Sequence, residues 1–187
     1  MSNILVLHGH NSKPYPDYPI YKELADNVIT FNAPFSMPGA PDRYKWFTLP
    51  EENIPGADPF AEVEQSVKYI LEKIGDTEID VLFGRSQGGF MALYLTLNNL
   101  IRPKKTIAAV PFYLPNLIHE NINKETPILW MAGGKDERIP PEVGNLYKNL
   151  IDAGANLDYL VDSDSGHSTD TWTQNFKDTI TEWSKNN

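Results

Sequence analysis

Ser86 is the residue of this sequence best placed to act as a nucleophile. It lies in Gly84-Arg85-Ser86-Gln87-Gly88-Gly89, directly after the apolar run Val81–Phe83 and before an uncharged stretch, residues 87–101. A tight turn from a strand into a helix leaves no room for side chains two positions from the serine, which explains Gly84 and Gly88. Such a turn exposes the serine at a helix N-terminus, where the helix dipole favours negative charge. The alternatives are a glycine-rich turn with an ordinary serine and a phosphate-binding turn.

A serine hydroxyl needs a base to activate it, and the base needs an acid to orient it. His167 in Ser165-Gly166-His167-Ser168 follows the last apolar run, and we predict that it is the base. Asp136 follows the run Ile128–Met131 and is the predicted orienting acid. Other carboxylates could take that role: Glu137, Asp162 and Asp164. Because sites on such sheets lie beyond the carboxyl ends of the strands, these groups are expected to meet at one edge.

An acyl-transfer site also needs donors for the negatively charged oxygen of its intermediate. We expect one from the backbone N–H of Gln87, directly after the serine. The second is expected from the backbone N–H of His10, because Leu7-His8-Gly9-His10-Asn11 ends a predicted strand and contains a glycine. The side chain of Asn11 is a weaker candidate. His8 and His10 could alternatively bind a metal, but two histidines without a third ligand nearby are weak evidence, so no metal or cofactor is predicted.

Short apolar runs predict the strands that position these groups. They are residues 4–7, 28–31, 81–83, 107–110, 128–131 and 157–161. Most are apolar on consecutive positions, as in parallel strands covered on both faces. Apolar spacings of three and four predict helices near residues 58–74, 87–101, 140–154 and 172–183. The alternation predicts a three-layer α/β/α sandwich with a mostly parallel sheet of about six strands, in one domain, residues 1–187.

One stretch, residues 34–59, is too long for a simple connection. Its aromatic residues, including Trp46 and Phe47, argue for packing rather than disorder. We interpret this stretch as a wall of the substrate pocket, with His8, Asn11, Trp46 and Phe47 as predicted substrate-binding residues. The alternative is that it only covers the core. Residues 114–126 leave too few positions for a large lid.

Charge and composition exclude several classes of protein. The net charge of −9 argues against a nucleic-acid-coating protein and against a polybasic membrane anchor. The absence of cysteine excludes a disulfide scaffold, a thiolate zinc site and a cysteine nucleophile. No apolar run reaches the roughly 18 residues of a membrane span, and no secretory signal is visible. We therefore expect a cytoplasmic protein, a monomer or a homodimer, whose partner is a small-molecule substrate.

Together these motifs resemble the α/β-hydrolase superfamily, and most closely its phospholipase/carboxylesterase branch, which includes acyl-protein thioesterases. Four stretches carry the resemblance: Leu7-His8-Gly9, residues 84–89, residues 134–140 and Gly166-His167. The order Ser86, Asp136, His167 is that of α/β-hydrolases. The resemblance implies a minimal α/β-hydrolase fold in which the first strand already bears the oxyanion loop.

The predicted function is a serine carboxylesterase that cleaves small or short-chain esters through an acyl-serine intermediate. A thioesterase or another acyl hydrolase is one alternative, because the sequence does not discriminate leaving groups. A non-catalytic binding protein on the same scaffold is another, since a fold does not imply a function.

Overall fold

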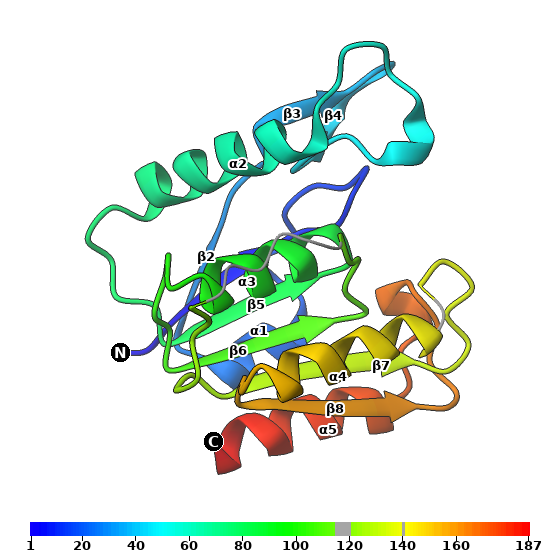
Figure 1. Cartoon of the computed structure of the whole chain (residues 1–187). Helices are drawn as coiled ribbons and strands as arrows, with labels where there is room; N and C mark the ends of the chain where they lie inside the picture. Colours follow the sequence, from blue (N-terminus) through cyan, green and yellow to red (C-terminus); the bar gives the residue numbers. More distant parts are fainter. Residues whose placement is uncertain (115–120, 140) are drawn as a thin grey trace.

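The computed structural model describes residues 1–114, 121–139 and 141–187. Within them lies a sheet of six strands: β1 (Asn3–Leu7), β2 (Asn27–Thr30), β5 (Val81–Arg85), β6 (Lys105–Ala109), β7 (Ile128–Gly133) and β8 (Leu157–Asp162). The strand order is β2-β1-β5-β6-β7-β8, and every pairing is parallel. Each strand coincides with one of the predicted apolar runs, so the predicted six-stranded parallel sheet is confirmed (Figure 1).

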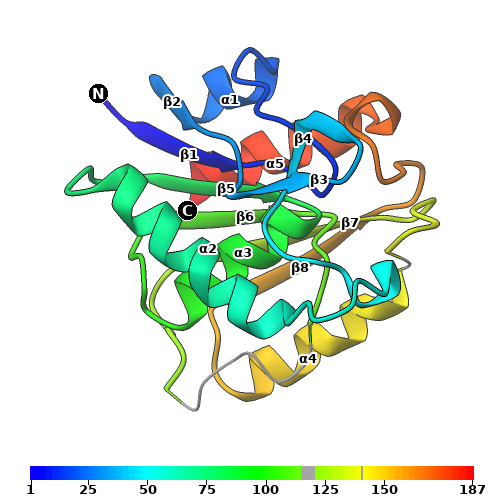
Figure 2. The ribbon, with the colours of Figure 1, turned by 90° about the horizontal axis from the view of Figure 1, so that it is seen from above.

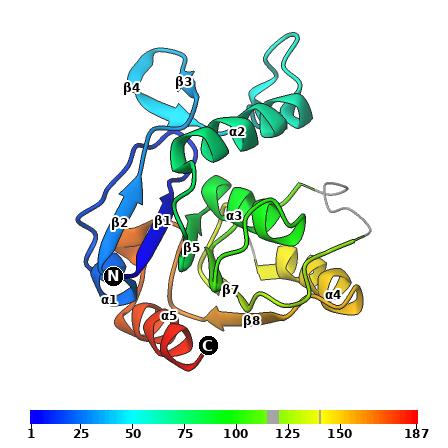
Figure 3. The same ribbon diagram turned by 90° about the vertical axis from the view of Figure 1, so that its left-hand side faces the viewer.

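Helices cover both faces of the sheet, as the apolar strands require. α1 (Pro19–Leu24) and α5 (Gln174–Asn186) lie on one face, and α2 (Pro59–Ile74), α3 (Gln87–Leu97) and α4 (Asn145–Asp152) lie on the other (Figure 3). The resulting three-layer sandwich is the predicted one. α2 begins where predicted, because the Asp58 side chain accepts hydrogen bonds from the backbone N–H groups of Phe60 and Ala61.

α3 is buried along its whole length, as its uncharged sequence predicted. It packs against β5 and β6 at the centre of the molecule. Because α3 starts directly after Ser86, the serine is anchored to a helix that is buried in the core.

Residues 34–59 contain an element that the sequence did not reveal. β3 (Phe35–Met37) and β4 (Ala40–Lys45) form an antiparallel hairpin, followed by a 3₁₀ turn, η1 (Pro50–Glu52). Seen from above, the hairpin lies over the β1 side of the sheet, and the chain then continues to η1 and α2 (Figure 2). The packing predicted for this stretch is confirmed, since Trp46 and Phe47 belong to the hydrophobic core.

One other predicted segment differs from the structure, and one agrees with it. The helix predicted to start at Pro140-Pro141 is a 3₁₀ turn, η2 (Pro141–Gly144), followed by α4, and Pro140 lies outside the described residues. Among the described residues, no helix or strand lies between β6 and β7, in line with the predicted absence of a large lid; residues 115–120 of that connection lie outside them. No helix in the described chain is long and apolar enough to cross a membrane.

Candidate functional site

Ser86 sits on a sharp turn between β5 and α3. Its backbone angles, φ 53° and ψ −117°, are unusual for a residue other than glycine. The turn is held because the Ser86 N–H donates to the Ala109 carbonyl at 3.0 Å, while the Ser86 carbonyl accepts from Phe90 and Phe112. A Cβ atom on Gly84 would lie 2.1 Å from the Gly88 oxygen, and one on Gly88 would lie 2.2 Å from the Leu7 oxygen. The glycine spacing is therefore a packing requirement of the turn.

The structure brings Ser86, His167 and Asp136 into one hydrogen-bonded chain. His167 Nε2 lies 3.0 Å from Ser86 Oγ, and His167 Nδ1 lies 2.8 Å from Asp136 Oδ2. The three residues come from the turn after β5, the turn after β7 and the loop after β8, at the carboxyl edge of the sheet. This is the arrangement expected from their positions after the strands.

Asp136 is held in its charged form. Burial by itself would raise its pKa, but hydrogen bonds from His167 and from the N–H groups of Ile139 and Arg138 bring the pKa below its usual value. A charged carboxylate only accepts hydrogen bonds, so the proton on the neutral His167 ring resides on Nδ1. The lone pair of Nε2 then faces Ser86, and the Ser86 hydroxyl can donate to it. This geometry allows His167 to take the proton of Ser86.

The other carboxylates near this edge have different partners. Asp162 accepts from the N–H groups of Asp164 and Ser165 and from the side chains of Thr173 and Asn175, so it braces the loop that carries His167. Asp164 pairs with Lys135 at 2.6 Å, and Glu137 is exposed. Of the four acids considered from the sequence, Asp136 is the one hydrogen-bonded to His167.

The loop after β1 lies directly against the serine turn. A Cβ on Gly9 would lie 3.4 Å from Ser86 Cβ, and His10 lines the same cavity as Ser86. Within the described chain, the backbone N–H groups of His10 and Gln87 donate no hydrogen bond. Both groups are therefore free to receive a ligand oxygen, as a pair of oxyanion donors must be.

His10 is tied to the hairpin by a small ionic cluster. Its Nε2 lies 3.2 Å from Glu52 Oε2, and Glu52 Oε1 accepts from the buried Lys45 at 2.8 Å. Glu52 also accepts from the N–H of Leu49 at 2.6 Å. Because one carboxylate holds both His10 and the end of β4, it couples the loop after β1 to the β3–β4 hairpin.

His8, Trp46 and Phe47 were predicted to bind substrate, but the structure places them beneath the cavity. His8 is 5% exposed, and Trp46 and Phe47 are fully buried. The Trp46 indole donates to the His8 carbonyl, and the Gln87 side chain accepts from the Trp46 N–H and donates to the Phe47 carbonyl. These residues therefore support the loop after β1 and the serine turn from the interior of the protein. The sequence alone could not distinguish an aromatic residue that supports the site from one that lines it.

His8 is neutral and fixed in one orientation. Its Nε2 accepts from the Ala33 N–H at 3.0 Å, which leaves Nδ1–H to donate to the Gly9 carbonyl at 2.8 Å. Burial lowers its pKa to about 4, and the nearby charge of Arg85 also lowers it. No cluster of metal ligands occurs among the described residues.

A cavity of about 560 Å³ opens above Ser86 and His167. Asn11 lines it, as predicted, and so does the 34–59 stretch, through Arg43, Leu49 and Glu51 rather than through its aromatic residues. The sequence interpretation missed several lining residues: Arg43, Arg85, Phe112, Arg138 and Ile139. Proximity to the motifs was the available signal for Arg85 and Arg138, which are one and two residues from Ser86 and Asp136.

Solved structures with the same fold cover nearly the whole chain. Esterase PE8 aligns with a TM-score of 0.80 and 24% identity over 99% of this chain and 92% of that one. SOBER1 of Arabidopsis thaliana aligns with a TM-score of 0.75 and 23% identity over 99% and 98% of the two chains. YahD, solved with malic acid, aligns with a TM-score of 0.73 and 18% identity over 100% and 93%. At these identities the likeness establishes the fold.

A comparison with curated protein sequences gave no match. A comparison with protein families, however, matches residues 27–186 to the family described as Phospholipase/Carboxylesterase. This match spans most of the chain, including the serine turn, the Asp136 turn and the His167 loop. The chain therefore belongs to the phospholipase/carboxylesterase family of α/β-hydrolases.

Proposed function

We propose that this protein is a serine hydrolase that cleaves small or short-chain carboxylic esters through an acyl-serine intermediate. The single observation that carries the proposal is the continuous hydrogen-bonded chain from Ser86 Oγ through His167 to Asp136. Membership of the phospholipase/carboxylesterase family supports hydrolysis as the general reaction.

In the proposed acylation step, Ser86 Oγ attacks the ester carbonyl while His167 Nε2 takes the hydroxyl proton. The carbonyl π electrons move to the oxygen, which accepts hydrogen bonds from the N–H groups of His10 and Gln87. Collapse of this intermediate breaks the bond to the alcohol, and His167 returns the proton to the leaving oxygen. Asp136 keeps the ring oriented and stabilises its positive charge throughout.

In deacylation a water molecule takes the place of the alcohol. His167 removes a proton from the water as its oxygen attacks the acyl-serine carbonyl, and the acid is released when Ser86 recovers its proton. The same two N–H donors serve both steps.

The cavity favours a small substrate. Its volume of about 560 Å³ lies in the range of small-ligand sites. Three apolar side chains, Leu49, Phe112 and Ile139, line it, which suits a short acyl or alcohol chain. Thioesters and amides present a similar carbonyl, so a thioesterase is the second candidate within the same mechanism.

Hydrolysis of 4-nitrophenyl acetate by the wild type and by Ser86→Ala tests the proposal. We expect turnover by the wild type and a loss of several orders of magnitude in kcat for the variant. Circular dichroism and thermal unfolding should show that Ser86→Ala remains folded. Comparable turnover by the two proteins would refute the role of Ser86, and no turnover by the wild type with any ester, thioester or amide would favour a binding protein.

A further inference from the structure

The arginines of this chain are concentrated at one place. The sequence contains four arginines and twelve lysines. Three of the arginines, Arg43, Arg85 and Arg138, line the cavity above Ser86, whereas no lysine of the described chain does so. This concentration contrasts with the net charge of −9 for the whole protein. Most of the arginines of this acidic protein therefore lie at one cavity.

Separate elements bring these arginines together. Arg85 precedes the serine at the end of β5, Arg138 follows Asp136 by two residues after β7, and Arg43 lies on β4. The Arg85 guanidinium contacts the loop after β1, since a Cβ on Gly9 would lie 2.9 Å from its Nη2. The positive charges therefore lie beside the serine turn, beside the acid turn and on the hairpin that covers them.

None of the three guanidinium groups has a carboxylate within 4 Å or a hydrogen-bond partner in the part of the chain that the structure describes. By contrast, two lysines that are close in sequence to Arg43 and Arg138, Lys45 and Lys135, are paired with Glu52 and Asp164. Arginine pairs readily with carboxylates, so three such groups without a partner at one cavity leave its positive charge available to a ligand.

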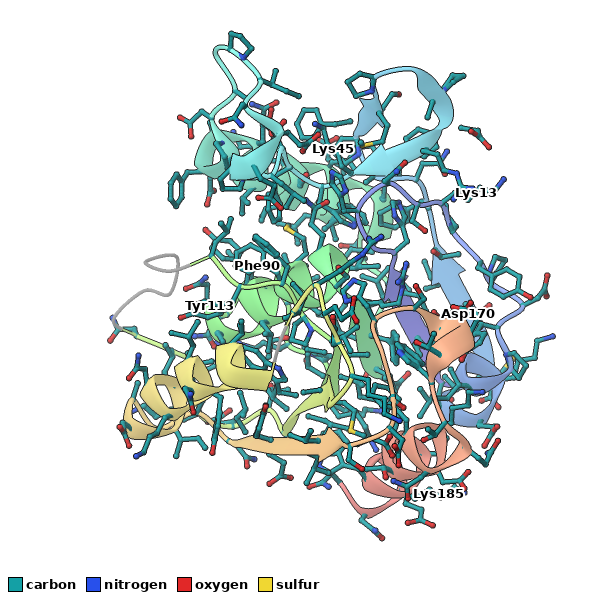
Figure 4. The ribbon with its side chains drawn as sticks, turned by 90° about the vertical axis from the view of Figure 1, so that its right-hand side faces the viewer. Lys13, Lys45, Phe90, Tyr113, Asp170 and Lys185 are labelled. Carbon is teal, nitrogen blue, oxygen red and sulfur yellow. The ribbon has the colours of Figure 1, made fainter. Side chains whose placement is uncertain are left out.

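Arg85 lies close to charges of both signs. Burial lowers the pKa of Arg85 below its usual value, and the neighbouring charge of Arg138 lowers it too. Four acids lie nearby: Glu51 lines the cavity, and Asp170 attracts Arg85 from η3 (Thr169–Thr171). Glu52 and Asp136 lie behind the lining, where they bind His10 and His167. Figure 4 shows Asp170 on the same side of the molecule as Lys13, which lines a smaller neighbouring cavity together with Arg85. Among the side chains that line the cavity, three guanidinium groups face one carboxylate, so the lining itself carries a net positive charge.

We propose that this cavity binds an anionic oxygen group, a carboxylate or a phosphate, carried by the ester substrate away from the bond that is cleaved. This inference rests on the proposed function and names its substrate class. The planar fork of a guanidinium donates two parallel hydrogen bonds to either group. Such charge-assisted bonds, formed in a partly desolvated cavity, correspond to about 10- to 100-fold in affinity.

Inhibition of 4-nitrophenyl acetate hydrolysis tests the charge preference. The probes are glutarate, inorganic phosphate and the neutral glutaramide, each at low and high salt. We expect glutarate or phosphate to inhibit competitively at concentrations at least about 10-fold below glutaramide, with an effect that weakens as salt increases. Stronger inhibition by glutarate than by phosphate assigns the group as a carboxylate, and the reverse assigns it as a phosphate. Equal inhibition by glutaramide would overturn the proposal.

Matched variants locate the effect. Arg138→Gln and Arg43→Gln should each weaken inhibition by the preferred anion about 10-fold and leave inhibition by glutaramide within a factor of three. Arg102→Gln is the control, because Arg102 is exposed and lines a different cavity. Unchanged anion inhibition in both cavity variants would overturn the assignment to these arginines.

The same preference should appear in catalysis. Monomethyl glutarate and methyl valerate have acyl chains of equal length and differ in the terminal carboxylate, and a pH-stat follows the hydrolysis of each. We expect the wild type to favour monomethyl glutarate in kcat/KM if glutarate is the better inhibitor, and Arg138→Gln to reduce that ratio. A larger kcat/KM for methyl valerate in this case would contradict the proposal.

The two proposals can fail separately. If Ser86-dependent hydrolysis occurs without anion preference, the proposed function stands and this inference fails. If no ester is hydrolysed, titration calorimetry of glutarate and phosphate into the wild type and Arg138→Gln still measures the anion site. Binding of neither anion in that measurement would refute the inference directly.

Discussion

The buried histidine beneath the oxyanion loop should make the stability of this protein depend on pH in a specific way. His8 is 5% exposed, accepts a hydrogen bond from the Ala33 N–H and donates one to the Gly9 carbonyl. Protonation would add a second N–H where Nε2 now accepts, so the charged ring loses its bond to Ala33. The informative perturbation is His8→Gln, because the Gln side-chain oxygen can replace Nε2 as an acceptor and does not titrate.

The magnitude follows from the pKa of His8 in the two states. Burial lowers it from 6.5 to about 4 in the folded protein. Between these pH values His8 binds a proton in the unfolded chain but not in the folded chain. The free energy of unfolding therefore decreases as the pH falls through 6.5 towards 4. Linkage gives a loss of about 2 kcal/mol between about pH 7.5 and about pH 5 from this one group.

Urea unfolding of the wild type and of His8→Gln at these two pH values measures the difference. Other groups titrate in both proteins, so the relevant quantity is the change in unfolding free energy with pH, compared between the two. We expect the free energy of unfolding of His8→Gln to fall by about 2 kcal/mol less than that of the wild type on acidification.

His10→Gln is the matched control, because it removes a partly exposed histidine of the same loop and keeps His8. It should retain most of the pH-dependent loss. Equal losses in the wild type and in His8→Gln would refute the reasoning, because the buried neutral ring would then contribute nothing to the pH dependence.

Three further substitutions test the supports of the site. Asp136→Asn should keep the fold but reduce kcat for 4-nitrophenyl acetate by about 10²- to 10⁴-fold, since the ring of His167 would no longer be held in the reactive tautomer. Gly88→Ala should lower the unfolding free energy by more than about 2 kcal/mol in urea titrations, because its Cβ would lie 2.2 Å from the Leu7 oxygen. Glu52→Gln should cost about 2–4 kcal/mol in the same assay, because it leaves the buried charge of Lys45 without its partner.

The two stability substitutions each have a control, and all three substitutions have a contradicting result. Gly39→Ala has open space around its Cβ and should cost only the strain of its positive φ, about 1 kcal/mol. Asp164→Asn breaks the exposed pair with Lys135 and should cost about 0–1 kcal/mol. A stability loss for Gly88→Ala or Glu52→Gln no greater than that of its control would contradict the packing or the ion-pair argument. Wild-type kcat in Asp136→Asn would contradict the tautomer argument.

The parts of the fold that depend on local pattern could be predicted from the sequence. Consecutive apolar positions identified all six parallel strands, and the uncharged run after Ser86 identified the buried central helix. The meeting of Ser86, Asp136 and His167 could also be predicted, because each follows a predicted strand. Parallel strands bring their carboxyl ends to one edge of the sheet, and the three residues meet there.

The remaining features depend on contacts between distant segments. The β3–β4 hairpin lies in a stretch of mixed polarity, where Arg43 and Tyr44 gave no strand periodicity. The sequence allows Trp46 and Phe47 to be either core or pocket residues. Their place in the core depends on a distant contact, because the Gln87 side chain binds the backbone of both residues. The three arginines of the cavity come from separate elements, so their convergence is visible only in three dimensions.

Covalent labelling of Ser86 tests the central claim most directly. The folded protein is treated with a fluorophosphonate, and the modified residue is identified by mass spectrometry of its peptides. We expect stoichiometric modification of Ser86 with parallel loss of esterase activity, and no modification of Ser86→Ala. Active, folded protein without an adduct on Ser86 would contradict the assignment of Ser86 as the nucleophile.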